Sequence, residues 1–281
     1  MSVVAVVGAG EVGAAAARAI ALRSRIGIVR LIDASESIAA GKALDLMESG
    51  PVRGFDTRIE GVADLSGAAS AAAIVIADPA GSGEWSGEPA LAMLRRLHEL
   101  GCLEHSILVY AGSSQRALMQ QGFDDLGLSR RRVLGSAPEA LASTARALVA
   151  IEARATPHQV TLTVIGAPPD RMAVPWQDGS VGGHAISAIL TPPQLRQVER
   201  RLRGLWPPGP NALGTAAALL AEAAVVGSRR LFSAFVSLDR DNGSKAPVCA
   251  WPVSVGPAGL ERISAPVLTG RERMIVEGLL E

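Results

Sequence analysis

The sequence predicts an α/β protein in which an N-terminal Rossmann unit, a doubly wound parallel sheet, is followed by an α+β domain. Apolar runs alternate with helical patterns in the first half of the 281 residues, as in parallel sheets whose strands are connected by helices. The first run, Val3–Val7, leads directly into a glycine-rich segment at 8–13. The second half has a different order of helices and strands. We therefore predict two domains, 1–135 and 136–281.

The individual elements follow from the period of the apolar residues and from their breakers. In the first half we predict strands at 3–7, 28–33, 57–62, 73–77, 106–110 and 132–134, and helices at 11–22, 38–47 and 89–100. In the second half we predict helices at 138–153, 192–205, 211–226 and 269–280, and strands at 159–165, 231–238, 246–255 and 260–263. Thr269 is the expected N-cap of the last helix.

Charge and composition exclude several classes of protein. Lys plus Arg and Asp plus Glu both number 27, so no basic excess favours nucleic acid as a partner. The two cysteines, Cys102 and Cys249, are not spaced as a metal site, and we expect no metal. Residues 1–7 lack the basic start of a signal peptide, and no apolar stretch is long enough to span a membrane. We expect a cytoplasmic protein whose partners are small molecules or other subunits.

The segment at 8–13 has the G-x-G-x-x-G pattern of a dinucleotide-binding loop, between a strand and a helix. Its glycines permit a tight turn, close approach of a pyrophosphate and close packing of the helix. We expect the following residues to bind the cofactor: Gly8, Ala9, Gly10, Glu11, Val12 and Gly13. Asp33 ends the second strand, and a carboxylate there is expected to bind the ribose hydroxyls of NAD. FAD or an S-adenosyl group also suits the pattern, and a turn kept only for packing is the alternative without a ligand.

Several further segments carry distinctive patterns in a fixed order. They are L-I-D at 31–33 with G-K-A-L-D-L at 41–46, G-L-S-R-R-R-V-L-G at 127–135, S-T-A-R at 143–146, G-A-P-P-D-R-M-A-V-P at 166–175, and A-P-V at 246–248 with V-G-P-A-G at 255–259. Together they resemble the NAD-dependent lactate/malate dehydrogenases, from residue 3 to about residue 280. The resemblance implies NAD as cofactor, hydride transfer involving a 2-hydroxy acid, and a homodimer or homotetramer, for which the helices at 14–22 and 38–47 suit close packing between subunits.

Most of the catalytic residues that the resemblance implies are replaced. Pro168 stands where the family has its general acid/base His, and Ser143 stands where it has the Asp that orients this His. The loop at 80–88 contains no Lys or Arg, although the family carries a carbonyl-polarising Arg there. Arg146 is the counterpart of the Arg that binds the substrate carboxylate, and we expect it to bind a small carboxylate. The catalytic residues are therefore unassigned.

Three functional hypotheses follow. The first is an NAD-binding oxidoreductase homologue whose usual reaction is lost or altered. The second is an active 2-hydroxy-acid dehydrogenase with a relocated base, for which His184 is the candidate, although the Pro168-Pro169 pair argues against it. The third is a structural or regulatory subunit without cofactor, against which the intact loop and Asp33 argue. Pro79 supplies no N–H where the family offers amides to the cofactor, and this predicts weakened or shifted NAD binding.

Overall fold

The computed structural model describes residues 2–238 and 247–280, so Ala246, which opens one predicted strand, lies outside the described residues. The chain forms two compact units. The first comprises Met1–Ala137, Gly209–Arg229 and Val255–Glu261, and the second comprises Pro138–Pro208, Arg230–Ser254 and Arg262–Glu281. This division is discontinuous, unlike the predicted domains 1–135 and 136–281, because a helix from the second half packs within the first unit.

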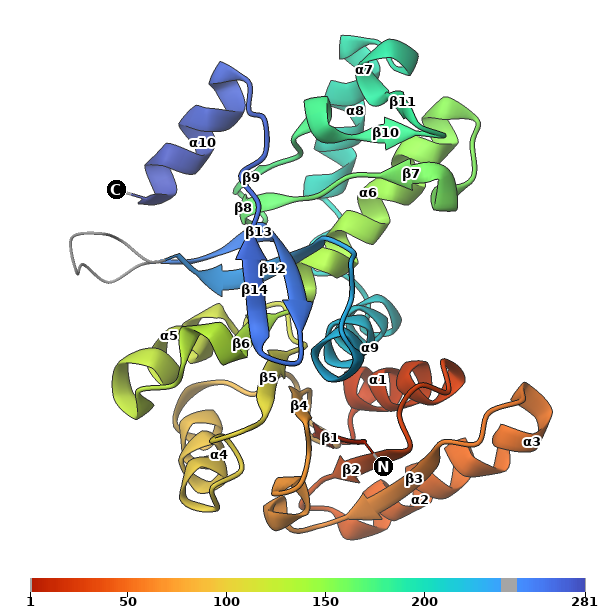
Figure 1. Cartoon of the computed structure of the whole chain (residues 1–281), viewed down its shortest axis with the longest axis vertical. Helices are drawn as coiled ribbons and strands as arrows, with labels where there is room; N and C mark the ends of the chain where they lie inside the picture. The colour runs from red at the N-terminus through yellow and green to blue at the C-terminus, as the bar shows by residue number, and fades with distance from the viewer. Residues whose placement is uncertain (1, 239–246, 281) are drawn as a thin grey trace. The chain divides into compact units, whose positions relative to one another are not determined.

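Six parallel strands form the sheet of the first unit, in the order β3-β2-β1-β4-β5-β6 (Figure 1). Their bounds are β1 (Val3–Val7), β2 (Ile28–Ile32), β3 (Arg58–Val62), β4 (Ala73–Ile76), β5 (Ile107–Tyr110) and β6 (Val133–Gly135). All residues of β1, β4 and β5 are buried, as their continuous apolar runs predict. The strand order reverses between β1 and β4, and ligands of such sheets bind at the carboxyl ends of the strands beside this switch point.

The helices of the first unit connect these strands. They are α1 (Glu11–Leu22), α2 (Glu36–Glu48), α3 (Gly50–Arg53), α4 (Gly87–Glu99), α5 (Arg116–Leu126) and α9 (Pro210–Val226), with 3-10 turns η1 (Leu65–Ala68) and η2 (Arg130–Arg132). The sequence predicts α1, α2, α4 and α9 but not α5. The residues that α5 buries are Leu118, Met119, Gly122 and Phe123.

Small residues bring α9 against α1. A Cβ added to Gly214 would lie 2.6 Å from the Cβ of Ala15 and 2.6 Å from the backbone N of Ala16. Glu222 of α9 is buried, and its carboxylate accepts hydrogen bonds from Arg23 and, at 2.8 Å, from Nη1 of Arg25. This combination of close contact and ion pairs explains why α9 belongs to the first unit.

The second unit contains two antiparallel sheets. Their strands are β12 (Phe232–Ser237), β13 (Val248–Gly256), β8 (Ile165–Ala167) and β9 (Arg171–Ala173) in that order, and β11 (His184–Ala185), β10 (Ser180–Val181) and β7 (Val160–Thr161). β14 (Gly259–Ile263) follows β13, and its residues up to Glu261 belong to the first unit. The helices are α6 (Ala137–Ala153), α7 (Ile186–Ile189), α8 (Pro192–Arg203) and α10 (Gly270–Leu280), with 3-10 turns η3 (Pro157–Gln159) and η4 (Trp176–Asp178).

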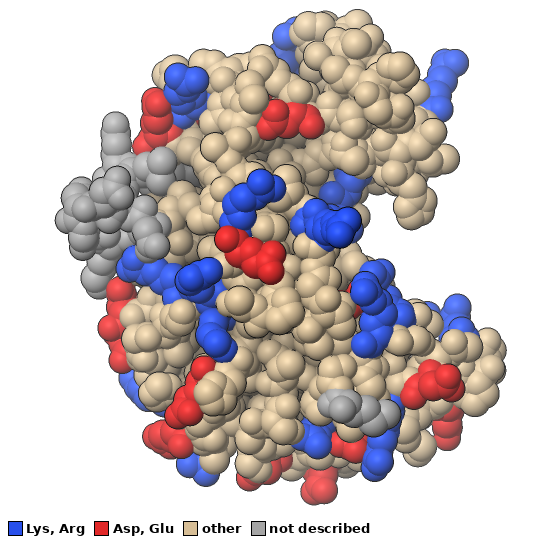
Figure 2. All heavy atoms as spheres, in the orientation of Figure 1, with Lys and Arg blue, Asp and Glu red and all other residues tan. Residues whose placement is uncertain are grey.

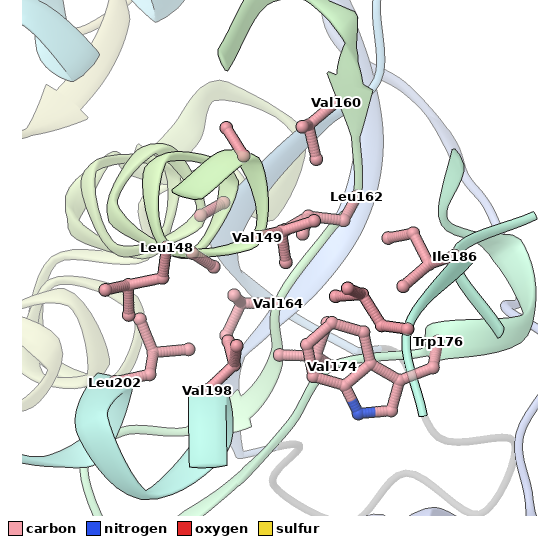
Figure 3. Packing of buried hydrophobic residues seen from close by; sticks show 14 of the residues in the cluster. Leu148, Val149, Val160, Leu162, Val164, Val174, Trp176, Ile186, Val198 and Leu202 are labelled. Atoms are coloured by element: carbon pink, nitrogen blue, oxygen red, sulfur yellow. The ribbon is translucent and has the colours of Figure 1, made fainter. Parts of the chain in front are cut away.

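The core of the second unit lies between α6, α8 and the chain from β7 to η4 (Figure 3). Leu148 and Val149 of α6 pack with Leu162, Val164 and other buried residues. The single strand predicted at 159–165 is wrong: β7 pairs with β10, whereas β8 pairs with β13 and β9. The alternating pattern continues across the break because Leu162 and Val164 are buried although they lie outside both strands.

Two further features concern the chain ends and the surface. Thr269 caps α10 as predicted, since its Oγ1 accepts the backbone N–H of Glu272 at 3.4 Å.

Lys and Arg side chains are interspersed with Asp and Glu on the face drawn in Figure 2, in agreement with the balanced charge. Among the described residues, no helix combines the length and the apolar character needed to cross a lipid bilayer.

The contact between α1 and α9 gives a first prediction. Gly214→Val should lower the free energy of unfolding by about 3 kcal/mol, because the added side chain must displace the backbone of α1. The control is Thr215→Ala, which changes an exposed neighbour on the same helix and should shift stability by no more than about 0.5 kcal/mol. Urea denaturation measures both, and equal effects of the two changes would contradict the packing described.

Candidate functional site

The glycine-rich loop between β1 and α1 packs directly against Asp78, the second residue after β4. Gly8 has φ +109°, a conformation that favours glycine, and a Cβ there would lie 2.4 Å from the carbonyl oxygen of Asp78. A Cβ on Gly10 would lie 2.3 Å from Cγ of Asp78. The backbone N–H of Gly10 also donates to the carbonyl oxygen of Asp78 at 2.8 Å. The first two glycines of the motif are therefore required by contacts within the chain.

The side chain of Asp78 occupies the N-terminus of α1. Its Oδ2 accepts the backbone N–H of Glu11 and its Oδ1 accepts that of Gly13, each at 2.9 Å. The N-cap residue Gly10 has no side chain, so a carboxylate from another strand satisfies the first turn of the helix. Asp78 is only 8% exposed. Sequence analysis did not select Asp78, although an acidic residue directly after the apolar run 73–77 is the signal that could have found it.

Asp33 also bonds to backbone amides of its own unit. Its Oδ2 accepts the N–H groups of Ala9 and Ala80, each at 2.8 Å, and its Oδ1 accepts that of Ser35 at 3.0 Å. A carboxylate has about four acceptor positions, so Oδ1 retains one for a further donor such as a ribose hydroxyl. The structure thus places Asp33 beside the loop, with most of its hydrogen-bonding capacity already used.

The backbone amides of the loop are therefore largely committed within the chain. Gly8 donates to the carbonyl oxygen of Ile32 at 2.7 Å, and the amides of Ala9, Gly10, Glu11 and Gly13 have the partners described above. Nζ of Lys42 donates to the carbonyl oxygens of Ala9, at 2.6 Å, and Gly10, at 3.1 Å. These bonds fix both sides of the loop backbone.

A cavity of about 350 Å³ adjoins the loop. Apolar side chains from several elements line it, together with Asp33, Asp64 and Arg96. Trp85 is a further lining residue, and its indole N–H is buried and has no hydrogen-bond partner among the described residues. A volume of this size lies at the lower end of the range for small-molecule sites. The cavity can therefore accommodate a small ligand beside the carboxylate of Asp33.

Glu84 fixes the segment that leads from β4 to α4. Its carboxylate accepts the N–H and the hydroxyl of Ser113, at 2.7 and 2.8 Å, and the N–H of Ser114, at 2.8 Å. Burial alone would raise the pKa of the Glu84 carboxyl, but the hydrogen bonds from Ser114 and Ser113 outweigh burial and hold this pKa below its ordinary value. The loop at 80–88, which carries no cation, is thus tied to the turn after β5.

In the second unit, the position predicted to have lost the acid/base residue lies in the turn between β8 and β9, where Pro168 and Pro169 are adjacent. His184, the candidate relocated base, lies on β11 in the other sheet and is exposed. The described residues show no hydrogen bond from His184 to a carboxylate. The structure therefore gives His184 none of the partners that orient a catalytic histidine.

Arg146 lies on α6 beside a buried carboxylate. Its Nη2 donates a hydrogen bond to Oε1 of Glu139 at 2.6 Å. The Glu139 side chain, which is 1% exposed, also accepts hydrogen bonds from the guanidinium of Arg230 and from the backbone N–H of Ser233, the latter at 2.9 Å. Arg146, Arg230 and His158 line a cavity of about 760 Å³ in the second unit. Sequence analysis missed Glu139 as the partner of Arg146, although the two lie seven residues apart on one helix. Binding of a carboxylate by Arg146 stays a prediction.

Comparison with known proteins identifies the family. The chain is 30% identical to the malate dehydrogenase of Chlorobium phaeobacteroides over 278 residues, which cover 92% of this chain and 89% of that protein. This chain belongs to the lactate/malate dehydrogenase family. It is also 27% identical to the malate dehydrogenase of Thermomicrobium roseum over 285 residues, which cover 96% of this chain and 92% of that protein. No family model matches the chain.

Solved structures of the family share the fold. Malate dehydrogenase from Salinibacter ruber matches with a TM-score of 0.82 at 23% identity, and the match covers 99% of this chain and 93% of that chain. Lactate dehydrogenase from Cryptosporidium parvum, complexed with lactic acid and nicotinamide adenine dinucleotide, matches with a TM-score of 0.83 at 21% identity, covering 99% and 94%. The predicted family and the predicted fold class are confirmed.

The fit of NAD to this member of the lactate/malate dehydrogenase family differs between the two ends of the site. At the adenosine end, the cavity and the remaining acceptor position of Asp33 suit a nucleoside. At the pyrophosphate, the amides of Glu11 and Gly13 are already bonded to a carboxylate. The amides of Glu11 and Gly13 are therefore not available to a pyrophosphate while the Asp78 carboxylate holds them.

The anchoring of Glu84 gives a second prediction. Glu84→Gln should lower the free energy of unfolding at pH 7 by about 2 kcal/mol, since the hydrogen bonds involve a charged acceptor. Because the folded pKa is lowered, this contribution is present above the ordinary carboxyl pKa and is lost as the pH falls through the folded value. The difference between parent and variant should thus disappear in acid. Denaturant titrations at several pH values measure it, with Glu88→Gln, an exposed carboxylate, as control.

Proposed function

We propose that this protein binds an adenosine group, which is also a part of NAD(H), beside Asp33 and no longer carries out the usual hydride transfer between NAD and a 2-hydroxy acid. The observation that carries the proposal is Pro168 at the position of the family's acid/base histidine, in a turn where its neighbour is also proline. Proline has no proton to transfer. The family, its whole-chain fold and the cavity beside Asp33 support the ligand part of the proposal.

The four histidines of the chain support the loss of acid/base chemistry. All of them, His98, His105, His158 and His184, are exposed. A histidine that acts as acid/base with a carboxylate partner is held in one orientation by that partner. The nearest such arrangement is His105 with Glu104 at 4.0 Å, between two exposed neighbours that lie outside the cavity beside Asp33.

The segment at 80–88 supports the same conclusion. It has no Lys or Arg to polarise a carbonyl, and Glu84 ties it to the turn after β5 through bonds from Ser113 and Ser114. A carboxylate in this segment would disfavour the negative charge that develops on a carbonyl oxygen during reduction. The arrangement thus suits binding better than reduction of a 2-keto acid.

A turnover assay tests this part of the proposal and gives a third prediction. With NADH and either oxaloacetate or pyruvate, the purified protein should oxidise NADH at least about 10³-fold more slowly than a malate dehydrogenase relative under the same conditions. Absorbance at 340 nm measures the rate. A rate within about tenfold of that of the relative would contradict the proposal if His184→Ala abolished it. Such a result would favour the relocated base.

We further propose that two copies of this chain associate through α2 and α3. Leu44 is 54% exposed and Val52 is 86% exposed, and Met47 lies between them, so three apolar side chains face solvent on neighbouring turns. The family resemblance implies a homodimer or homotetramer. Leu44 and Met47 lie on the helix predicted at 38–47 to suit subunit packing, and Val52 follows on α3.

Sedimentation velocity provides a fourth prediction. The double change Leu44→Asp and Val52→Asp should shift the protein toward the monomer, because a buried unpaired carboxylate costs several kcal/mol at an interface. The control is Met274→Asp, which places a charge at an exposed apolar residue of α10 in the second unit. A parent protein that sediments as a monomer at every concentration would contradict self-association.

A further inference from the structure

The carboxylate of Asp78 has the geometry of a bound anion. Two oxygens accept two amides of the first turn of α1, Glu11 and Gly13, each at 2.9 Å. Phosphate groups bind helix N-termini by the same kind of bond, because the first amides of a helix are unpaired and its dipole favours negative charge. In this chain the anion at that position is supplied by the protein itself.

We propose that Asp78 is an internal substitute for the ligand's phosphate, so that the cavity beside Asp33 takes an adenine nucleoside without a 5′-phosphate in preference to AMP or NAD(H). The proposal rests on the proposed function, because it concerns the same adenosine site. It differs from the usual property of the family, in which a dinucleotide is the ligand that the fold implies.

The backbone holds Asp78 at the loop. The preceding strand β4 pairs in register with β1, and Ile76 lies opposite Val7. The carbonyl oxygen of Asp78 accepts the N–H of Gly10 at 2.8 Å, and the absent side chain of Gly10 leaves the space that the Asp78 carboxylate fills. A rotation of the side chain would free the amides, but the carboxylate would still be attached beside them.

The charge of Asp78 opposes a phosphate at this position, whereas the cation of the loop, Lys42, is bonded to the carbonyl oxygens of Ala9 and Gly10. A pyrophosphate would have to break both bonds of Asp78 to the amides and then remain within a few ångströms of a like charge. Asp78 is 8% exposed, so little water screens the repulsion. The 5′-hydroxyl of a nucleoside brings no charge and can donate a hydrogen bond to the carboxylate.

The cavity provides complementary groups for a nucleoside. Asp33 retains one acceptor position for a ribose hydroxyl. The side chain of Trp85 also lines the cavity and adds flat apolar surface for the base. Ile32, Leu65 and Met93 supply apolar surface. These groups recognise the base and the sugar without any contribution from a phosphate.

Isothermal titration calorimetry with adenosine, AMP and NADH tests the proposal, with the parent protein and the variants Asp78→Asn and Asp64→Asn. The parent should bind adenosine about tenfold more tightly, or better, than AMP and NADH. Asp78→Asn should raise the affinity for AMP and NADH by about tenfold or more, because the substitution removes the negative charge and keeps the size of the side chain. The affinity for adenosine should change by less than about threefold. Asp64→Asn is the control. The Asp64 carboxylate lines the same cavity but bonds to the amide of Ser66 and not to the α1 amides, so the preference for adenosine over AMP and NADH should stay unchanged.

The outcomes separate the two proposals. If the parent binds NADH as tightly as adenosine, or if Asp78→Asn and Asp64→Asn have equal effects, the role of Asp78 is overturned while adenosine binding stands. If neither the parent nor Asp78→Asn binds any of the three probes, the proposed function fails and the inference fails with it. Asp78→Ala serves as the second uncharged variant, and thermal melts followed by circular dichroism verify that each variant is folded.

Discussion

The bond between the Asp78 carboxylate and the N-terminus of α1 is the contact on which the geometry of the first unit depends. It joins the end of β4 to the loop after β1, and the glycines at 8 and 10 make room for it. Asp33 and Glu84 act in the same way, because each collects backbone amides from segments distant in the sequence. Three carboxylates of the chain thus occupy donors that could otherwise serve a ligand.

The sequence predicts much of this fold and less of the site. Continuous apolar runs and the spacing of the glycines predict β1, the loop and α1, because these features are local. The partner of the loop amides is not local: Asp78 lies 65 residues beyond Gly13 and reaches it only through the parallel pairing of β1 and β4. For the same reason the sequence could not predict that α9 packs on α1. The pattern at 159–165 fails because burial alternates there without strand pairing.

Family membership and chemistry separate in this chain. The match extends over the whole length and the fold is shared, yet Pro168 occupies the expected acid/base position and Arg146 is paired with the buried Glu139. A fold supports several functions, and the function depends on the residues of the site. The function proposed for this chain, recognition of a nucleoside without hydride transfer, rests on those residues. The same scaffold with its own anion at α1 is consistent with a change of ligand as well as of reaction.

A crystal structure of the protein soaked with millimolar NADH would test the central claim most directly. The account predicts that the Asp78 carboxylate remains bonded to the amides of Glu11 and Gly13, and that no pyrophosphate density appears at the N-terminus of α1. Pyrophosphate oxygens on these two amides, with the Asp78 side chain rotated away, would contradict the account.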